Sequence, residues 1–278
     1  MNADQAMTSR GRTWFEALAG RQQINLSGVQ SVLVGDAEFI GERVRLISVV
    51  PDPTNRFPRA RGGEVGVEEG WTIAKYGRAV IGEKADGIKR PIVAIVDVPG
   101  QAYGLREELL GISLSCAAAA DMYASARLAG HPVVSLVVGR AFAAGFLAHG
   151  YQAHRILALD DPGVSIHAMG RQAAARVTRR TVEELAELSR TIIPMAYDIR
   201  ACAELGIVQR LIKVSSADAP STEDIARVKE EIFLAIADAR RGTSSPSGRV
   251  ETDVAQRHRR ASLEVYRRMT DQWSAAPA

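Results

Sequence analysis

The sequence predicts an α/β fold in which a mostly parallel sheet carries its helices on the outside. Two stretches support this prediction, because each runs from a short apolar strand through a turn of small residues into a helix: IVAIVDVPGQAYGL at 92–105 and VVSLVVGRAFAAGF at 133–146. Repeated strand–helix crossovers of this kind place the strands parallel and the helices against the sheet. With 278 residues, 46% of them hydrophobic and 24% charged, the chain can bury a substantial core.

Charge and cysteine usage narrow the function classes. The net charge is +3, from 35 basic and 32 acidic residues, and no aromatic residues interleave the basic stretches, which argues against nucleic acid or a membrane surface as a partner. Cys116 and Cys202 form no CxxC pair and are predicted to be buried, reduced thiols rather than a disulfide or a metal site. Residues 1–20 lack the apolar segment of a signal peptide, and no stretch is long enough to span a bilayer, so we expect a cytoplasmic protein.

The first part of the chain is expected to open with a polar arm, residues 1–25, that leads into a short helix at 13–19. The alternating pattern of 29–50 predicts two or three paired strands. Residues 51–63, rich in proline and arginine, are either a solvated connector or a lip over a site. An amphipathic helix follows at 66–86. Its apolar face is expected to hold Trp71, Ala74, Val80 and Ile81.

The rest of the chain is expected to alternate helices and strands. The predicted helices lie at 105–128, 182–189, 197–205 and 223–240. The predicted strands lie at 91–97, 133–138, 156–159, 164–166 and 207–214, with a tight turn at 139–140. Thr181 and Glu184 have the spacing of a capping box at the start of their helix. We therefore expect one domain over 1–245 and a basic, helical C-terminal extension over 246–278.

The second strand–turn–helix unit predicts an anion site. After the apolar run 133–138 come Ala141, Ala143, Ala144 and Gly145, so the helix begins with almost no side chains. The first backbone N–H groups of a helix have no partner within it and carry the positive end of its dipole. A developing negative oxygen can therefore approach these amides closely, which makes the turn a candidate oxyanion hole.

Two motifs carry a resemblance to a known family. VDVPGQAYGLREELLGI at 96–112 and VVGRAFAAGF at 137–146 are similar, in sequence and in spacing, to the two site loops of the carboxyltransferase branch of the crotonase superfamily. The resemblance covers roughly 65–215 and implies a crotonase-like (ClpP/crotonase) fold, a superhelix of repeated ββα units. Within this branch, the short chain, the segment WFEALAG and the loop 96–104 most resemble the gamma subunits of biotin-independent malonate decarboxylases.

The resemblance implies a reaction and its partners. The expected reaction converts a malonyl thioester into an acetyl thioester and carbon dioxide, with the active site at the interface to a beta subunit of related fold. The acyl group is expected on a phosphopantetheine-type arm of an acyl carrier protein, the delta subunit, and an alpha subunit is expected to act as the acyl carrier protein transferase. No cofactor and no metal is expected on this chain.

The residues agree with this chemistry. Loss of carbon dioxide leaves an enolate, and each amide that holds such an oxygen contributes about 3–4 kcal/mol. The resemblance places these amides on Ala144 and Gly145. Where relatives carry consecutive glycines this chain has alanines, so we expect helical φ values from Ala143 onward and a narrow site that favours a small acyl group over biotin. The predicted substrate-binding residues are Gly100, Gln101, Tyr103, Arg140, Phe142 and Ala143.

Several side chains have two interpretations. Asp97 either orients a catalytic group or satisfies backbone amides of its own turn. Tyr103 either donates to a substrate oxygen or packs. Arg140 either meets a carboxylate or a phosphate of the carrier's prosthetic group, or pairs with a partner subunit. The basic run 257–260 is either a solvated helix face or a docking site for an acidic carrier protein.

The histidines are predicted to be mainly structural. His131 stands at a strand start, and His149 and His154 do not share a helix face as metal ligands would. His167 titrates in a suitable range to protonate the enolate. We expect water or a beta-subunit residue to do so instead.

Three functions remain open from the sequence. The first is the gamma subunit of a malonate decarboxylase, the second a carboxyltransferase subunit of a biotin-dependent acyl-CoA carboxylase, and the third a non-catalytic scaffold within the same complex. Avidin separates the first two, because it inhibits only biotin-dependent transfer. The absence of GxSxG and GxGxxG motifs argues against a serine hydrolase and a dinucleotide enzyme.

Overall fold

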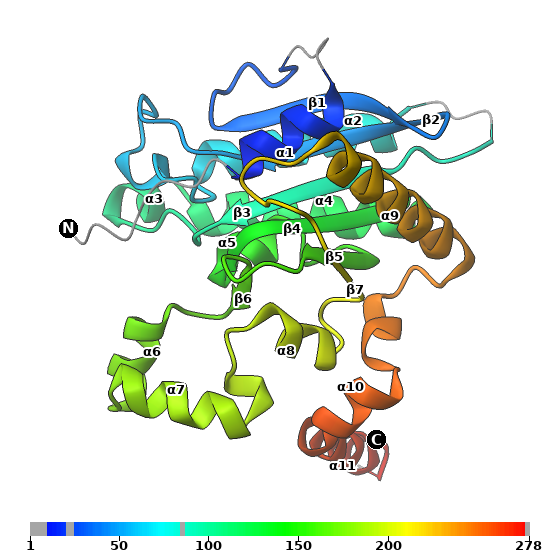
Figure 1. Cartoon of the computed structure of the whole chain (residues 1–278). Coiled ribbons are helices and arrows are strands. Elements are labelled where there is room, and N and C mark those ends of the chain that lie inside the picture. Colours follow the sequence, from blue (N-terminus) through cyan, green and yellow to red (C-terminus); the bar gives the residue numbers. More distant parts are fainter. Residues whose placement is uncertain (1–9, 21–24, 84–86, 276–278) are drawn as a thin grey trace.

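A seven-stranded sheet runs through the computed structural model, which describes residues 10–20, 25–83 and 87–275 (Figure 1). The strand order is β1-β2-β3-β4-β5-β7, and β6 pairs with the end of β4. Only β1 and β2 pair antiparallel among the described strands, so the predicted mostly parallel sheet is confirmed. The strands are β1 (Val32–Phe39), β2 (Glu42–Val49), β3 (Ile92–Val98), β4 (Val133–Phe142), β5 (Arg155–Leu159), β6 (Ser165–His167) and β7 (Arg210–Ile212).

Helices cover both faces of the sheet. In Figure 1, α1 (Arg10–Ala19) and α9 (Thr222–Arg241) lie in front of it, and α2 (Val67–Ile81) and α4 (Ile112–Leu128) lie behind. The described residues include no helix that is long and apolar enough to cross a membrane. The remaining helices are α3 (Leu105–Leu109), α5 (Ala143–Ala148), α6 (Arg171–Thr178), α7 (Val182–Thr191), α8 (Ile199–Glu204), α10 (Asp253–His258) and α11 (Arg260–Ala275), with short 3₁₀ turns at Pro58–Ala60, Ile193–Met195 and Pro246–Val250.

The helix α1 is part of the main core, although the sequence predicts only an arm and a short helix there. Trp14 and Leu18 are fully buried, and the Trp14 indole donates to the carbonyl of Ala217. The Arg10 guanidinium donates to Asp161 at 2.8 Å and to Asp218 at 2.6 Å, which fixes α1 to distant parts of the chain. Residues 1–9 and 21–24 of the predicted arm lie outside the described residues.

Several predictions differ from the structure. The helix predicted at 105–128 is broken into α3 and α4, because Gly111 adopts a left-handed φ of 79° that no continuous helix contains. The strand predicted to stop at Gly139 continues to Phe142, since its last residues pair with β6. Trp71, predicted on the apolar face of its helix, is half exposed, whereas Ala74 and Val80 are buried.

The helices α2 and α4 pack closely at two glycines of α2. A Cβ atom added at Gly70 would lie 2.6 Å from the backbone oxygen of Ser115, and one added at Gly77 would lie 2.0 Å from the sulfur of Met122. Gly70→Ala is therefore expected to lower the free energy of unfolding by about 1–3 kcal/mol, because a tightly packed contact cannot accept another methyl group. Urea denaturation measures the loss.

Gly82→Ala is the matched control for this substitution. A Cβ atom there has no neighbour closer than 3.5 Å, and φ at this position is −79°. This variant is expected to unfold at the wild-type urea concentration or slightly above it. If Gly70→Ala lowers the free energy of unfolding no more than Gly82→Ala does, α2 and α4 are not in close contact at Gly70.

Candidate active site

A bulge in β4 shapes the end of the strand that leads to the candidate oxyanion hole. Val96 pairs with Val137, but Val98 pairs with Ala141, so β4 holds two more residues than β3 over this stretch. The buried Asp97 carboxylate accepts the backbone N–H of Arg140 at 3.0 Å, and the Arg140 Nε atom lies 3.7 Å from the same oxygen. Asp97 therefore satisfies an amide of the neighbouring strand.

The two loops predicted to form the site are in direct backbone contact. A Cβ atom added at Gly145 would lie 2.2 Å from the carbonyl oxygen of Gly100 and 2.4 Å from its carbonyl carbon. The Gly100 oxygen also accepts the N–H of Val65 at 3.0 Å, and Val65 in turn accepts the N–H of Ala102 at 2.9 Å. The loop after β3 is therefore fixed on both sides, and only glycine fits at 145.

The alanine at 143 does not have the expected conformation. Its φ is 52°, in the left-handed region, whereas the sequence analysis expects helical φ values from this residue onward. Phe142 is still extended, so the chain must turn from β4 into α5 within one residue. Such a conformation costs a non-glycine residue about 1–2 kcal/mol, and strain of this kind persists where the surrounding structure enforces it.

A cavity of about 500 Å³ adjoins the start of α5. It brings together three predicted site residues, Gln101, Ala143 and Ala144. Most of the remaining lining is apolar and comes from α5, from β6 and from the segment between α7 and β7: Phe146, Leu147, Tyr151, Ile166, Ala168, Pro194, Ala196, Cys202, Leu205 and Ile207, together with His167. The cavity therefore offers an apolar wall beside the first amides of α5.

The other predicted site residues lie outside this lining. Gly100 and Gly145 are buried in their mutual contact, and Arg140 lies within β4 beside Asp97. Tyr103 is largely exposed at the end of the loop, so it does not pack in the core. Phe142 lines a second cavity.

His167 is the imidazole in the wall of the apolar cavity. The backbone N–H of Met169 donates to its Nδ1 atom at 3.3 Å, so the neutral ring carries its hydrogen on Nε2. Its ring stacks on Tyr197, with centroids 3.6 Å apart and planes 5° from parallel. Burial lowers the pKa of His167 and thereby favours the neutral form. Burial also raises the pKa of the Cys202 thiol to about 11, which keeps this thiol protonated.

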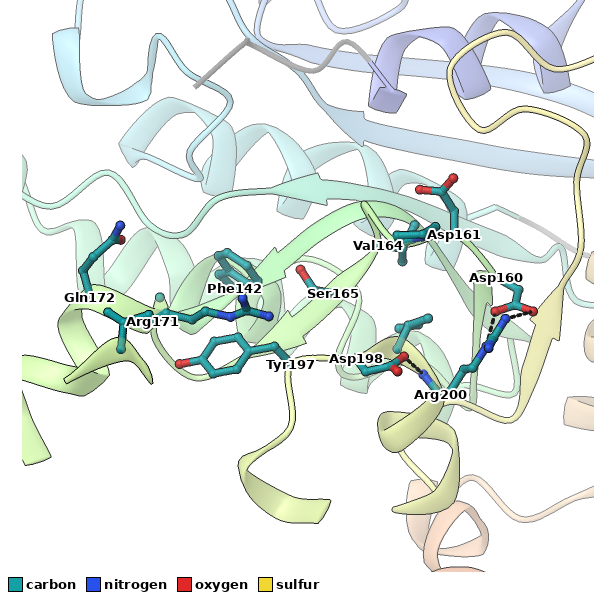
Figure 2. Close-up of a pocket in the computed structure, with 14 residues that line it drawn as sticks. Phe142, Asp160, Asp161, Val164, Ser165, Arg171, Gln172, Tyr197, Asp198 and Arg200 are labelled. Carbon is teal, nitrogen blue, oxygen red and sulfur yellow. Dashed lines mark hydrogen bonds and ion pairs between the residues drawn. The ribbon is translucent and has the colours of Figure 1, made fainter. Parts of the chain in front are cut away.

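Figure 2 shows the second cavity, of about 710 Å³, which is polar. The Asp160 carboxylate accepts from Arg200 Nε at 2.8 Å, and the Asp198 side chain caps α8 at the Arg200 amide. The Arg171 guanidinium lies 5.0 Å from the centroid of the Tyr197 ring. Because Tyr197 lines this cavity and stacks on His167, the two rings separate the polar cavity from the apolar one.

Sequence reasoning missed Tyr197, Arg171 and the apolar wall around Ile166. They come from β6, from α6 and from the segment before α8, and all of them follow both motifs in the chain. No periodicity or motif marks these residues, since only the folded chain brings the segments to β6.

The predicted structural role of His131 is confirmed, and His149 and His154 are also buried and hydrogen-bonded. His149 directly follows α5, and its Nδ1 atom contacts the Tyr123 hydroxyl at 3.0 Å while its Nε2 atom contacts the Ile95 oxygen at 3.1 Å. His154 accepts the N–H of Val133, and His131 contacts the Arg90 oxygen. Burial lowers the pKa of both His149 and His154 to about 4.

Comparison with known proteins places these features in a family. Residues 60–273 match the family model described as malonate decarboxylase gamma subunit. A Pseudomonas malonate decarboxylase hetero-tetramer, solved with coenzyme A, contains a chain 49% identical to this one, with a TM-score of 0.88 over 96% of this chain and 100% of that chain. The Pseudomonas MdcD-MdcE hetero-dimer gives 48% identity and a TM-score of 0.86 over the same shares, 96% and 100%.

A curated relative and a more distant fold extend the comparison. The malonyl-S-ACP:biotin-protein carboxyltransferase MADD of Malonomonas rubra is 38% identical over 180 residues, which is 63% of this chain but only 62% of that protein. Transcarboxylase 12S shares the fold alone, at 19% identity and a TM-score of 0.59 over 78% of this chain and 37% of that chain. This likeness confirms the predicted crotonase-like, carboxyltransferase-type fold. The chain belongs to the malonate decarboxylase gamma subunit family.

Proposed function

We propose that this chain, together with a beta subunit, decarboxylates a malonyl thioester carried on an acyl carrier protein. The observation that carries the proposal is the contact of Gly145 with Gly100 beside the apolar cavity. This contact holds the start of α5 against the loop after β3. The amides of Ala144 and Gly145 are proposed to hold the enolate oxygen that forms as carbon dioxide leaves.

The reaction needs groups that stabilise the negative charge on the atom that receives it. The electron pair of the bond between C2 and the carboxyl carbon forms the enolate, so the negative charge passes from the carboxylate to the thioester oxygen. An apolar wall disfavours the charged carboxylate, whereas the amides favour the charged enolate oxygen. C2 then takes a proton from water or from a beta-subunit residue, and the acetyl thioester results.

The predicted substrate-binding residues take different places in this proposal. Gln101 and Ala143 line the part of the cavity that is proposed to hold the acyl group. The backbone of Gly100 contacts Gly145 next to it. Tyr103 and Phe142 lie outside the lining of the apolar cavity. There they contact either the carrier's prosthetic arm or the residues around the malonyl group. Arg140, held beside Asp97, fixes the end of β4 and presents the remaining guanidinium donors to an anionic group.

The proposal extends to the assembly. The thioester is carried on a phosphopantetheine-type arm of the delta subunit, an alpha subunit transfers the acyl carrier protein, and the complex works in the cytoplasm. Residues 1–245 act as the carboxyltransferase-type unit. Residues 246–278, which include α10 and α11, act as a helical extension of that unit.

Biotin-dependent carboxyl transfer is the second candidate. The Malonomonas relative, whose name includes a biotin protein as acceptor, favours it. Against it stand the side chains of Ala143 and Ala144 in the cavity wall, since their methyl groups narrow the space beside the amides.

Reconstitution with the beta subunit and malonyl-loaded carrier protein tests the proposal. We expect mass spectrometry to show that the carrier loses the mass of carbon dioxide, at a rate that avidin leaves unchanged. Inhibition by avidin would support the carboxyltransferase instead. Full turnover by the beta subunit without this chain would show that the chain is a non-catalytic scaffold.

A further inference from the structure

His167 lies where the apolar cavity meets the start of α5. In the pairing of β4 with β6 it stands opposite Phe142, the last residue before α5. It also lines the same cavity as Ala143 and Ala144. A substrate group in this cavity therefore has the imidazole and the first turn of α5 in one wall.

Contacts with Met169 and Tyr197 fix the imidazole ring of His167. The Met169 N–H donates to Nδ1 at 3.3 Å, and the Tyr197 hydroxyl donates to the Met169 oxygen at 3.1 Å. The Tyr197 ring stacks on the imidazole, and the Arg171 guanidinium lies over the Tyr197 ring (Figure 2). The imidazole is therefore oriented before a ligand binds, which lowers the entropy that binding costs.

The Nε2 atom of His167 is available to a ligand. Because Nδ1 accepts the Met169 N–H, the hydrogen of the neutral ring lies on Nε2. No residue within the described part of the chain accepts a hydrogen bond from Nε2, and this atom is not buried. Ligand cavities typically combine apolar walls with a few oriented polar groups of this kind, which select the ligand.

The other polar side chains of the cavity wall are placed differently. The Cys202 thiol donates to the Ile166 oxygen at 3.8 Å. Tyr151 follows the end of α5, and its ring packs edge-to-face on Phe146. Gln101 comes from the loop after β3. His167 is therefore the side-chain donor that β6 brings to the first turn of α5.

A malonyl group differs from the acetyl product by one carboxylate, which lies two bonds from the thioester carbon. A hydrogen bond from a neutral donor holds this carboxylate, whereas a cation would stabilise the negative charge that must leave it as carbon dioxide forms. Burial lowers the pKa of His167, and the charge of Arg171 also lowers it, so the imidazole is neutral at pH 7. His167 therefore suits a carboxylate that is about to be lost.

We propose that the Nε2–H group of His167 binds the malonyl carboxylate and thereby distinguishes malonyl from acetyl carrier protein. This inference deepens the function proposed above and rests on it. With the thioester oxygen at the amides of Ala144 and Gly145, the carboxylate lies against the β6 side of the cavity. Tyr197 is a positioning residue, because it acts through the imidazole ring.

Two amide variants, assayed in the complex reconstituted with the beta subunit, test this contact. The side chain of His167→Gln can place an N–H group near the position of Nε2, whereas the shorter side chain of His167→Asn places it near Nδ1. We expect His167→Asn to raise the KM for malonyl carrier protein about 10- to 100-fold, as for a lost hydrogen bond to a charged group. His167→Gln should stay within about threefold of wild type.

Two further measurements separate a lost carboxylate contact from a disturbed cavity. The kcat of His167→Asn should not fall, because the contact weakens as the carboxylate leaves. The inhibition constant of acetyl carrier protein should be unchanged, since acetyl lacks the carboxylate. His167→Phe keeps a ring to stack on Tyr197 but has no donor, so it should raise the KM as His167→Asn does.

Two outcomes would overturn the carboxylate contact. One is a wild-type KM for both His167→Asn and His167→Phe. The other is an equal weakening of malonyl and acetyl carrier protein by these variants. Failure of the proposed function has a different signature. The wild-type complex would then bind malonyl carrier protein more tightly than acetyl carrier protein in calorimetry, and lose this preference in His167→Asn, without releasing carbon dioxide.

Discussion

Gly145→Ala is expected to reduce decarboxylation by the assembled complex at least about 100-fold. The added methyl group would lie 2.2 Å from the Gly100 oxygen, so α5 and the loop after β3 must separate. That movement displaces the two amides proposed to hold the enolate oxygen, and loss of one such donor alone lowers kcat about 100- to 1,000-fold. Single-turnover mass spectrometry of the carrier protein, with saturating beta subunit, measures the chemical step directly.

Gly170→Ala controls for the substitution itself. A Cβ atom there has no neighbour within 4 Å, and φ is −62°, so an alanine fits without strain. We expect wild-type turnover for this variant. If Gly145→Ala assembles with the beta subunit and keeps wild-type turnover, the amides of Ala144 and Gly145 are not the oxyanion hole.

The stability of the chain is expected to fall when the pH drops from 7.5 to 5. His149 and His154 are buried, with pKa values of about 4, whereas an unfolded histidine titrates near 6.5. Between these values the unfolded chain binds more protons than the folded chain, so protonation favours unfolding. Each histidine is expected to cost about 2 kcal/mol of unfolding free energy at pH 5.

Comparison of variants isolates this effect from the other titrating groups. Burial raises the pKa of Glu69, which works in the opposite direction because the folded chain then binds its proton first. His149→Gln and His154→Gln should therefore each make the pH dependence of wild-type unfolding shallower by about 2 kcal/mol between pH 7.5 and 5. Urea titrations at both pH values measure this difference. Slopes equal to that of wild type would mean that the two histidines are not buried in their neutral forms.

The parallel sheet and the two site loops were predictable because local sequence determines them. The run 92–98 is β-branched and fully buried, and the small residues after β4 permit the sharp entry into α5. The capping box at Thr181 also forms as its sequence indicates. In each case the signal lies within a few residues of the feature.

The features that sequence reasoning missed depend on distant segments. At the bulge in β4, the Asp97 carboxylate of β3 accepts the Arg140 amide, and no local sequence pattern predicts that pairing. The positive φ of Ala143 is imposed in the same way, by the β6 pairing before it and the Gly100 contact after it. The apolar cavity needs β6 and α8 to meet α5, which only the tertiary fold decides.

The contact between Gly100 and Gly145 has a consequence for how such a protein is studied. Its proposed chemistry uses main-chain groups, and the residues that carry them are already alanine or glycine. An alanine scan truncates side chains, so it would pass over Ala143 and Ala144 without changing an atom. Of residues 143–145, an alanine scan therefore tests only Gly145, where the substitution adds a methyl group instead of removing a side chain.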